Sequence, residues 1–190
     1  MPRRFSLACA LVSLLAIPAQ AAVIHDEGID GDLSGVFATP DPLAVATGAN
    51  TIVAQIGANG DTGATNGNDA DYFSITLGGG QSITSITVDA YTFSPADPNV
   101  SFFGYTSGSG FTGQTAGDID GNVLFNAASG DVLSSLAGGP LGTGTWSFWI
   151  QETSGNVVDY QLTFTIVPEP STATLLALGL VGLAIRRGRS

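Results

Sequence analysis

The central part of this sequence lacks basic side chains. All five Lys and Arg residues are arginines, and they occupy positions 3, 4, 186, 187 and 189. Residues 5–185 hold all sixteen acidic side chains, thirteen Asp and three Glu, and neither Lys nor Arg. This excludes a basic patch that could neutralise the phosphates of a nucleic acid. It also excludes any Lys or Arg salt bridge within residues 5–185.

Cysteine and histidine are almost absent as well. Cys9 is the only cysteine and His25 the only histidine, so no intrachain disulfide can form and the fold must depend on its core or on bound ions. We expect His25 to be an exposed spectator, because a catalytic base needs a rigid position and His25 lies close to the predicted mature N-terminus. Without lysine or a further cysteine, carboxylates are the remaining candidates for acid–base chemistry.

The first 21 residues predict a signal peptide that signal peptidase removes. A basic start is followed by an apolar stretch over residues 5–17, which would form the signal helix. The motif Ala19-Gln20-Ala21 is a cleavage site of the A-x-A type, so the mature chain should begin at Ala22. Cys9 lies in the middle of the apolar stretch rather than at its end, which argues against a lipoprotein.

Residues 168–190 have three parts in a fixed order. Pro168-Glu169-Pro170 stops any regular element, because proline fixes φ and lacks an amide donor. Residues 171–185 are uncharged and largely apolar, and they predict a short transmembrane helix. The tail over residues 186–190 would stay in the cytoplasm by the positive-inside rule, held there by Arg186, Arg187 and Arg189.

This arrangement resembles the PEP-CTERM sorting signal of Gram-negative bacteria. The resemblance implies that exosortase, a membrane-embedded cysteine protease, cuts the membrane-anchored precursor near Pro-Glu-Pro. It further implies release or transfer to the cell surface, typically in strains that make exopolysaccharide. The alternative is a plain tail anchor in the membrane that is never cut.

Residues 22–167 predict one all-β domain. Alternating apolar and polar residues between Gly-, Asn- and Asp-rich turns indicate about eight strands in two antiparallel sheets, a sandwich. A bulge is expected near Thr84-Ser85, because Ile83 is out of phase with the rest of its strand. The expected strands cover residues 51–56, 71–77, 81–91, 100–106, 123–125, 132–136, 145–151 and 158–167.

Part of this domain also resembles a known module. The segment Asp69–Leu77, the glycine turn with Gln81-Ser82-Ile83 and the segment Gly142–Gln151 are similar to the bacterial pre-peptidase C-terminal (PPC) domain. The resemblance implies a jelly-roll-like sandwich that serves secreted enzymes as a non-catalytic accessory.

One loop fits the template of a calcium site. Asp30, Asp32 and Ser34 stand at positions 1, 3 and 5, and Asp41 stands at position 12. Ser34 is a weak ligand, Asp41 replaces the usual bidentate Glu, and no helices flank the loop. Asp118-Ile119-Asp120 is a second, shorter candidate, and plain turn formation is the alternative for both segments.

Trp149 is the aromatic residue that alternation turns away from its strand's apolar face, so it could stack on a sugar of an extracellular polysaccharide, or be covered by a loop or by the second sheet. Asp69 and Asp71 could form a glycosidase pair, although turn capping or metal ligation explains them as well. We therefore expect an exported, non-enzymatic protein of the cell surface or exopolysaccharide matrix. The alternatives are a calcium-dependent carbohydrate-binding module and, third, a surface hydrolase.

Overall fold

A computed structural model describes residues 21–57, 69–94, 100–115, 117–136, 139–153 and 157–169. Within these ranges the chain forms nine strands and two helices of four residues each. The predicted signal helix and transmembrane helix lie outside the described residues.

The first sheet has four strands in the order β1-β3-β9-β5. Its strands are β1 (Ala22–Asp26), β3 (Gly48–Gly57), β9 (Val157–Pro168) and β5 (Gln81–Ser94). β9 pairs antiparallel with both β3 and β5, whereas β1 pairs parallel with β3. β5 has register shifts between Ile83 and Ser85 and between Val88 and Ala90, and the first of these confirms the bulge that the sequence predicts.

The second sheet has five strands in the order β2-β4-β8-β6-β7. Its strands are β2 (Asp41–Leu43), β4 (Ala70–Leu77), β8 (Gly144–Glu152), β6 (Ser101–Ser107) and β7 (Gly121–Phe125). β4, β8, β6 and β7 pair antiparallel in this order, whereas β2 pairs parallel with β4.

The expectation of wholly antiparallel sheets is therefore wrong at one edge of each sheet. The chain passes from β1 in the first sheet to β2 in the second before it returns as β3. A connection of this length lets β3 run in the same direction as β1, whereas a short hairpin would force the two strands to be antiparallel.

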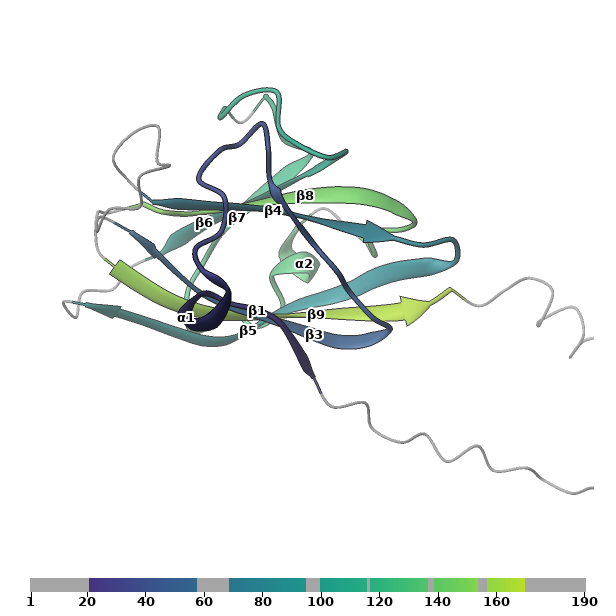
Figure 1. The fold of residues 1–190 in the computed structure, drawn as a ribbon, viewed down its shortest axis with the longest axis horizontal. Helices are drawn as coiled ribbons and strands as arrows, with labels where there is room; N and C mark the ends of the chain where they lie inside the picture. Colours follow the sequence, from purple (N-terminus) through teal and green to yellow (C-terminus); the bar gives the residue numbers. More distant parts are fainter. Residues whose placement is uncertain are drawn as a thin grey trace, which may run out of the picture.

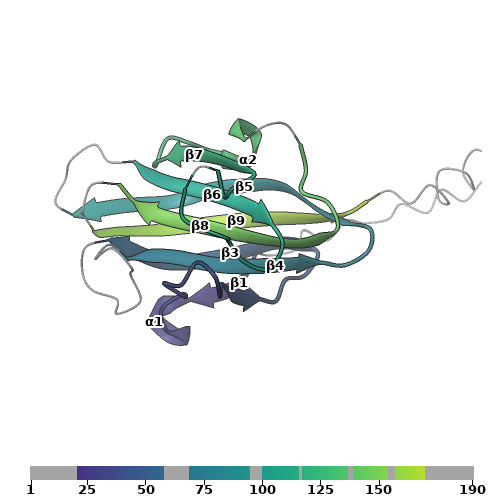
Figure 2. The ribbon, with the colours of Figure 1, turned by 90° about the horizontal axis from the view of Figure 1, so that it is seen from above.

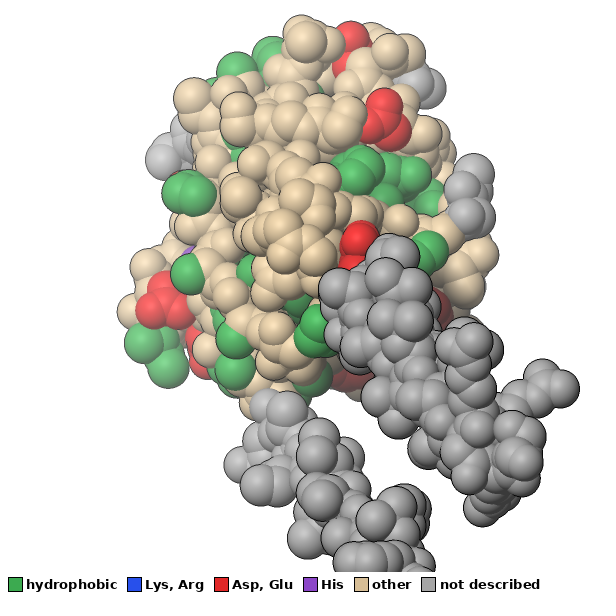
Figure 3. Space-filling model, turned by 90° about the vertical axis from the view of Figure 1, so that its right-hand side faces the viewer, with side chains coloured by type: hydrophobic (Ala, Val, Ile, Leu, Met, Phe, Trp, Pro, Cys, Tyr) green, Lys and Arg blue, Asp and Glu red, His purple; other side chains and the backbone are tan. Residues whose placement is uncertain are grey.

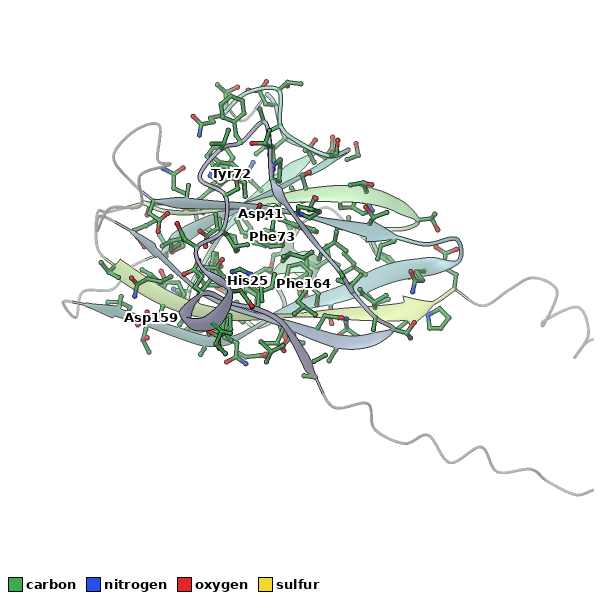
Figure 4. All side chains as sticks on the ribbon, viewed as in Figure 1. His25, Asp41, Tyr72, Phe73, Asp159 and Phe164 are labelled. Carbon is green, nitrogen blue, oxygen red and sulfur yellow. The ribbon has the colours of Figure 1, made fainter. Side chains whose placement is uncertain are left out.

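The two sheets pack face to face around an aromatic core (Figure 1). Phe73 of β4 and Phe164 of β9 meet edge to face, with ring centroids 5.8 Å apart, and Phe148 of β8 lies 5.2 Å from Phe164. Phe73 and Phe164 lie between the sheets in Figure 4, whereas Tyr72, the neighbour of Phe73, points to the other face of β4. Alternation along β9 buries Tyr160, Leu162, Phe164 and Ile166, as the sequence predicts.

A second apolar cluster lies on the outer face of the second sheet. Tyr72 and Trp149 are its centre, and Phe111 covers them from the loop that follows β6. Because this loop covers the outer face of β4 and β8, Ala70 and Tyr72 are buried along with the inward-facing residues of β4.

The two helices lie at opposite edges of the sheets (Figure 2). α1 (Glu27–Asp30) follows β1, and Asp26 caps its first turn by accepting a hydrogen bond from the amide of Gly28 at 3.0 Å. α2 (Val132–Ser135) packs against β5 and β7, where Val132 and Leu133 are buried. The predicted strand over residues 132–136 is wrong, because the Asp131 carboxylate caps this turn and favours a helix.

Candidate functional site

The predicted sorting motif, Pro168-Glu169-Pro170, begins inside the folded domain. Pro168 is the last residue of β9 and pairs with Gln81 of β5, one residue beyond the predicted end of the strand. The amide of Glu169 then donates a hydrogen bond to the carbonyl oxygen of Gly80, at 2.6 Å. Pro170, the apolar run 171–185 and Arg186, Arg187 and Arg189 lie outside the described residues.

The end of the domain at which β9 stops faces the viewer in Figure 3, and the described charged side chains visible there are acidic. A shallow hollow beside the junction is lined by Ser82, Thr84, Pro140, Gly142, Val167 and Glu169. Glu169 itself is exposed. The first residues of the motif are therefore held against the domain, and the glutamate side chain faces solvent.

A second polar feature is a cluster of three carboxylates, from Glu27, Asp32 and Asp71. One carboxylate oxygen from each residue lies within 4.8 Å of the other two. Glu27 comes from α1, Asp32 from the loop after it, and Asp71 from β4 of the second sheet. In Figure 1 the chain leaves α1 beside the first sheet and rises to the second, so this segment, residues 27–34, crosses the open side between the sheets.

Two contacts fix the carboxylates of Glu27 and Asp71. The hydroxyl of Tyr160, on β9 of the first sheet, donates a hydrogen bond to Oδ2 of Asp71 at 2.5 Å. The amide of Gln55, on β3, donates to Oε2 of Glu27 at 2.7 Å. Oδ1 of Asp71 and Oε1 of Glu27 are buried, and neither accepts a hydrogen bond from any described residue.

Burial dominates the electrostatics of this carboxylate cluster. The pKa of Asp71 is raised well above its usual value, first because burial removes the carboxylate from water and then because of the nearby charge of Glu27. Burial also raises the pKa of Glu27, although the hydrogen bond from Gln55 opposes the shift. The pKa of Tyr160 is raised by burial and by the Asp71 charge. A negative charge is therefore costly here unless a cation balances it.

The structure separates the residues of the predicted calcium loop. Asp32 belongs to the carboxylate cluster, whereas Asp30 accepts a hydrogen bond from the amide of Asp26 at 2.9 Å. Asp41, at the start of β2, accepts one from the amide of Ser34 at 2.8 Å. Asp30 and Asp41 thus stabilise local backbone. Glu27 and Asp71, rather than Asp30 and Asp41, join Asp32 in the carboxylate cluster. The sequence prediction missed Glu27 altogether.

The second predicted loop stabilises a turn. Asp118 accepts hydrogen bonds from the Thr115 side chain at 2.7 Å and from its amide at 3.0 Å, and these bonds lower the pKa of Asp118. Asp120 accepts one from the amide of Ser107 at 2.6 Å. The two carboxylates serve the connection between β6 and β7.

His25 is not the exposed spectator that the sequence suggested. Its side chain is 7% exposed, and its buried Nε2 atom has no hydrogen-bond partner among the described residues. The prediction assumed a frayed N-terminus, but β1 joins the first sheet as an edge strand, and its register shift lies between Val23 and His25. Electrostatic attraction to His25 lowers the pKa of Glu27, so His25 lies near the carboxylate cluster.

Trp149 lies under a loop. It is 7% exposed, its ring stacks on Tyr72 with centroids 5.7 Å apart, and Phe102 lies 4.6 Å away. Of the two predicted roles, the structure therefore favours the packed one, since a sugar ring would first have to displace Phe111 and its loop.

The predicted signal-cleavage residues fall at the border of the described chain. Ala19 lies outside it, Ala21 is exposed, and Ala22 is the first residue of β1. The predicted mature N-terminus thus coincides with the start of regular structure, and cleavage itself stays a prediction.

Comparison with protein families agrees with the sorting signal predicted from the last residues of the sequence. Residues 167–189 match the family model of the PEP-CTERM protein-sorting motif. The chain carries an exosortase sorting motif. This motif implies exosortase as the processing partner and an exported, membrane-anchored precursor. A comparison with curated proteins gave no match. Among the described residues, no helix is long and apolar enough to cross a membrane.

Proposed function

We propose that this chain is a non-enzymatic protein of the cell surface or exopolysaccharide matrix, delivered there by its sorting motif. The observation that carries the proposal is the match of residues 167–189 to the PEP-CTERM motif. The junction between the motif and the domain supports delivery of a folded unit, because β9 lies between β3 and β5 and leads directly into Pro168 and Glu169.

The surroundings of Asp71 support a non-catalytic role. A glycosidase pair must face a solvent-filled cleft in order to reach a polymer. Asp71 is fully buried, and its Oδ2 atom is occupied by the Tyr160 hydroxyl. Its partner in the predicted pair, Asp69, is 8% exposed. This geometry favours a structural or ion-binding role over the hydrolase alternative.

The carbohydrate-binding alternative has lost its stacking platform, because Trp149 is covered. A jelly-roll-like connectivity and a relationship to the PPC domain stay predictions, and the two-sheet architecture is compatible with both. We therefore prefer delivery to the surface over recognition of a sugar by Trp149.

The proposal is tested by following the full chain in a host with and without an active exosortase. We expect mass spectrometry to find a C-terminus near Pro168-Glu169-Pro170 and loss of residues 171–190 in the first host alone. The test variant replaces the exposed Glu169 of the motif by Gln and should be cut less, and its matched control replaces the exposed Asp159 by Asn. Asp159 lies far from the motif on the outer face of the first sheet, so D159N should be processed normally (Figure 4).

An uncut chain that stays in the membrane fraction of both hosts would support the plain tail anchor and contradict the proposal. Detection of the processed chain in the cytoplasm, rather than outside the cell, would contradict delivery to the surface.

A further inference from the structure

The carboxylate cluster differs from an ordinary group of acidic residues in one respect. One oxygen of Asp71 is buried there without a hydrogen-bond donor from the described part of the chain. Asp71 is fully buried, and its Oδ1 atom has no hydrogen-bond partner among the described residues. The Tyr160 hydroxyl holds the other oxygen at 2.5 Å and so fixes the side chain beside Glu27 and Asp32. A buried carboxylate oxygen without a donor is costly, and it is satisfied by a bound proton, cation or water.

The chain supplies almost no positive charge of its own here. Residues 5–185 include no Lys or Arg, so neither sheet, α1 nor the loop after it can place one beside Asp71. The groups that face the site are the carboxylates of Glu27, Asp32 and Asp69, the Tyr160 hydroxyl, and His25 beside Glu27. Three carboxylates converge on one point, and His25 is the one side chain near them that can carry a positive charge.

We propose that Glu27, Asp32 and Asp71 bind one calcium ion. All three donors are carboxylate oxygens, which select hard cations over zinc or copper. Calcium–oxygen distances of about 2.3–2.6 Å place two ligands of one ion up to about 5 Å apart. The spacing within 4.8 Å fits this limit. Calcium also accepts irregular shells that water completes, whereas magnesium demands a near-ideal octahedron.

The proposed ion joins three parts of the fold. Glu27 and Asp32 lie in the N-terminal segment and Asp71 in the second sheet, while Tyr160 links Asp71 to the first sheet. Bound calcium would therefore fasten the N-terminal segment, residues 22–34, across the open side of the two sheets. In a chain without disulfides, such an ion would provide the cross-link that a disulfide bond provides in other small exported domains.

The test is a thermal melt of the full chain, purified in a non-ionic detergent because of its apolar run over residues 171–185. One sample contains ~1 mM calcium, near the range that extracellular modules bind. The other contains a chelator and NaCl at the same ionic strength. We expect calcium to raise the Tm by roughly 1–5 °C, and titration calorimetry to give one ion per chain.

Variants locate the ion. E27Q, D32N and D71N each remove one proposed ligand charge, and we expect each to lose most of the calcium-dependent rise. D71N has a further signature: in chelator its Tm should equal or exceed that of the wild type, because the amide still accepts from Tyr160 while a buried charge disappears. A purely structural role for Asp71 would lower the Tm equally with and without calcium.

D30N and D41N are the matched controls, because each removes one Asp charge from the same segment outside the carboxylate cluster. Both should keep the full calcium-dependent rise. The proposal fails if calcium does not raise the Tm of the wild type, or if D32N and E27Q keep the full calcium-dependent rise. It also fails if D30N and D41N lose as much of this rise as D32N and E27Q lose. Asp32 is exposed, so D32N decides the question even if D71N does not fold.

Discussion

At the scale of single residues, the hydrogen bond between Tyr160 and Asp71 joins the two sheets through the core. Tyr160 belongs to β9 and Asp71 to β4, and both side chains are almost fully buried. A buried polar group that loses its partner costs about 1–3 kcal/mol. This pair is therefore a position where one hydroxyl group should have a measurable effect on stability.

We predict that Tyr160→Phe lowers the free energy of unfolding by about 1–3 kcal/mol in chelator, because Oδ2 of Asp71 loses its donor. A double-mutant cycle with Asp71→Ala, which removes the accepting oxygen, measured by urea unfolding, should give a coupling free energy of similar size. Tyr91→Phe is the control, because its hydroxyl contacts the neutral Ser101 hydroxyl at 2.8 Å and should cost less. Additive effects of Y160F and D71A would contradict the prediction.

The residues of the carboxylate cluster also show where prediction from the sequence ended. Asp32 was found because a loop template has fixed spacing, and spacing is a local property. The sequence indicated Asp71 only as one half of a pair with Asp69 on the same strand. It did not indicate Tyr160, which donates to Asp71 from the other sheet. Glu27 has no local signature at all. Their convergence depends on the pairing of β1 with β3 and on where this pairing places α1 and the loop after it. No short window of sequence encodes that arrangement.

At the scale of elements, alternation predicted those strands whose two faces differ. β9 buries every second residue from Tyr160 to Ile166, so its pattern was plain. β1 and β2 were missed, since they are short edge strands that gain order from pairing rather than from an alternating pattern. The segment 132–136 is apolar enough for a strand, but its capping residue turned it into α2.

Asp131 is therefore a position at which element identity can be tested. One carboxylate oxygen, Oδ1, accepts from the amide of Leu133 at 3.1 Å and from the amide of Ile86 on β5 at 2.9 Å. It caps α2 and also pairs an amide at the edge of the first sheet. We predict that Asp131→Ala lowers the free energy of unfolding by about 1–3 kcal/mol, measured by urea denaturation.

Asp131→Asn is the comparison, because an amide oxygen can still accept from both donors. It should cost clearly less than the alanine variant. An equal loss in the two variants would mean that the charge of Asp131, rather than its accepting oxygen, stabilises the edge.

At the scale of the whole molecule, the absence of basic residues changes how the domain responds to pH. Most proteins lose lysine charges near pH 10, close to the range in which tyrosines ionise. Residues 5–185 contain no lysine, so the four tyrosines are the groups left to titrate there. Burial raises the pKa of all four, to about 12 for Tyr72, with Gln114 opposing the shift through a hydrogen bond at 2.6 Å.

This arrangement fixes the sign of the alkaline response. Below pH 10 the tyrosines are protonated in both states and do not affect the pH dependence. Above the ordinary pKa of about 10 the unfolded chain releases these protons, whereas the folded chain retains them. The free energy of unfolding must then fall as the pH rises from about 10, until the folded-state pKa values are passed. For Tyr72 that limit is about pH 12.

We predict that urea unfolding, repeated between about pH 9 and 12, shows stability unchanged up to pH 10 and a steady decline above it. Tyrosinate absorbance should rise together with unfolding. Tyr72→Phe should make the decline shallower by up to about 1.4 kcal/mol per pH unit, the contribution of one proton. Tyrosinate absorbance that titrates near pH 10 while the fold stays intact would contradict the raised pKa values. A decline that Y72F leaves unchanged would assign the alkaline limit to the other tyrosines, among which Tyr160 is fully buried against Asp71.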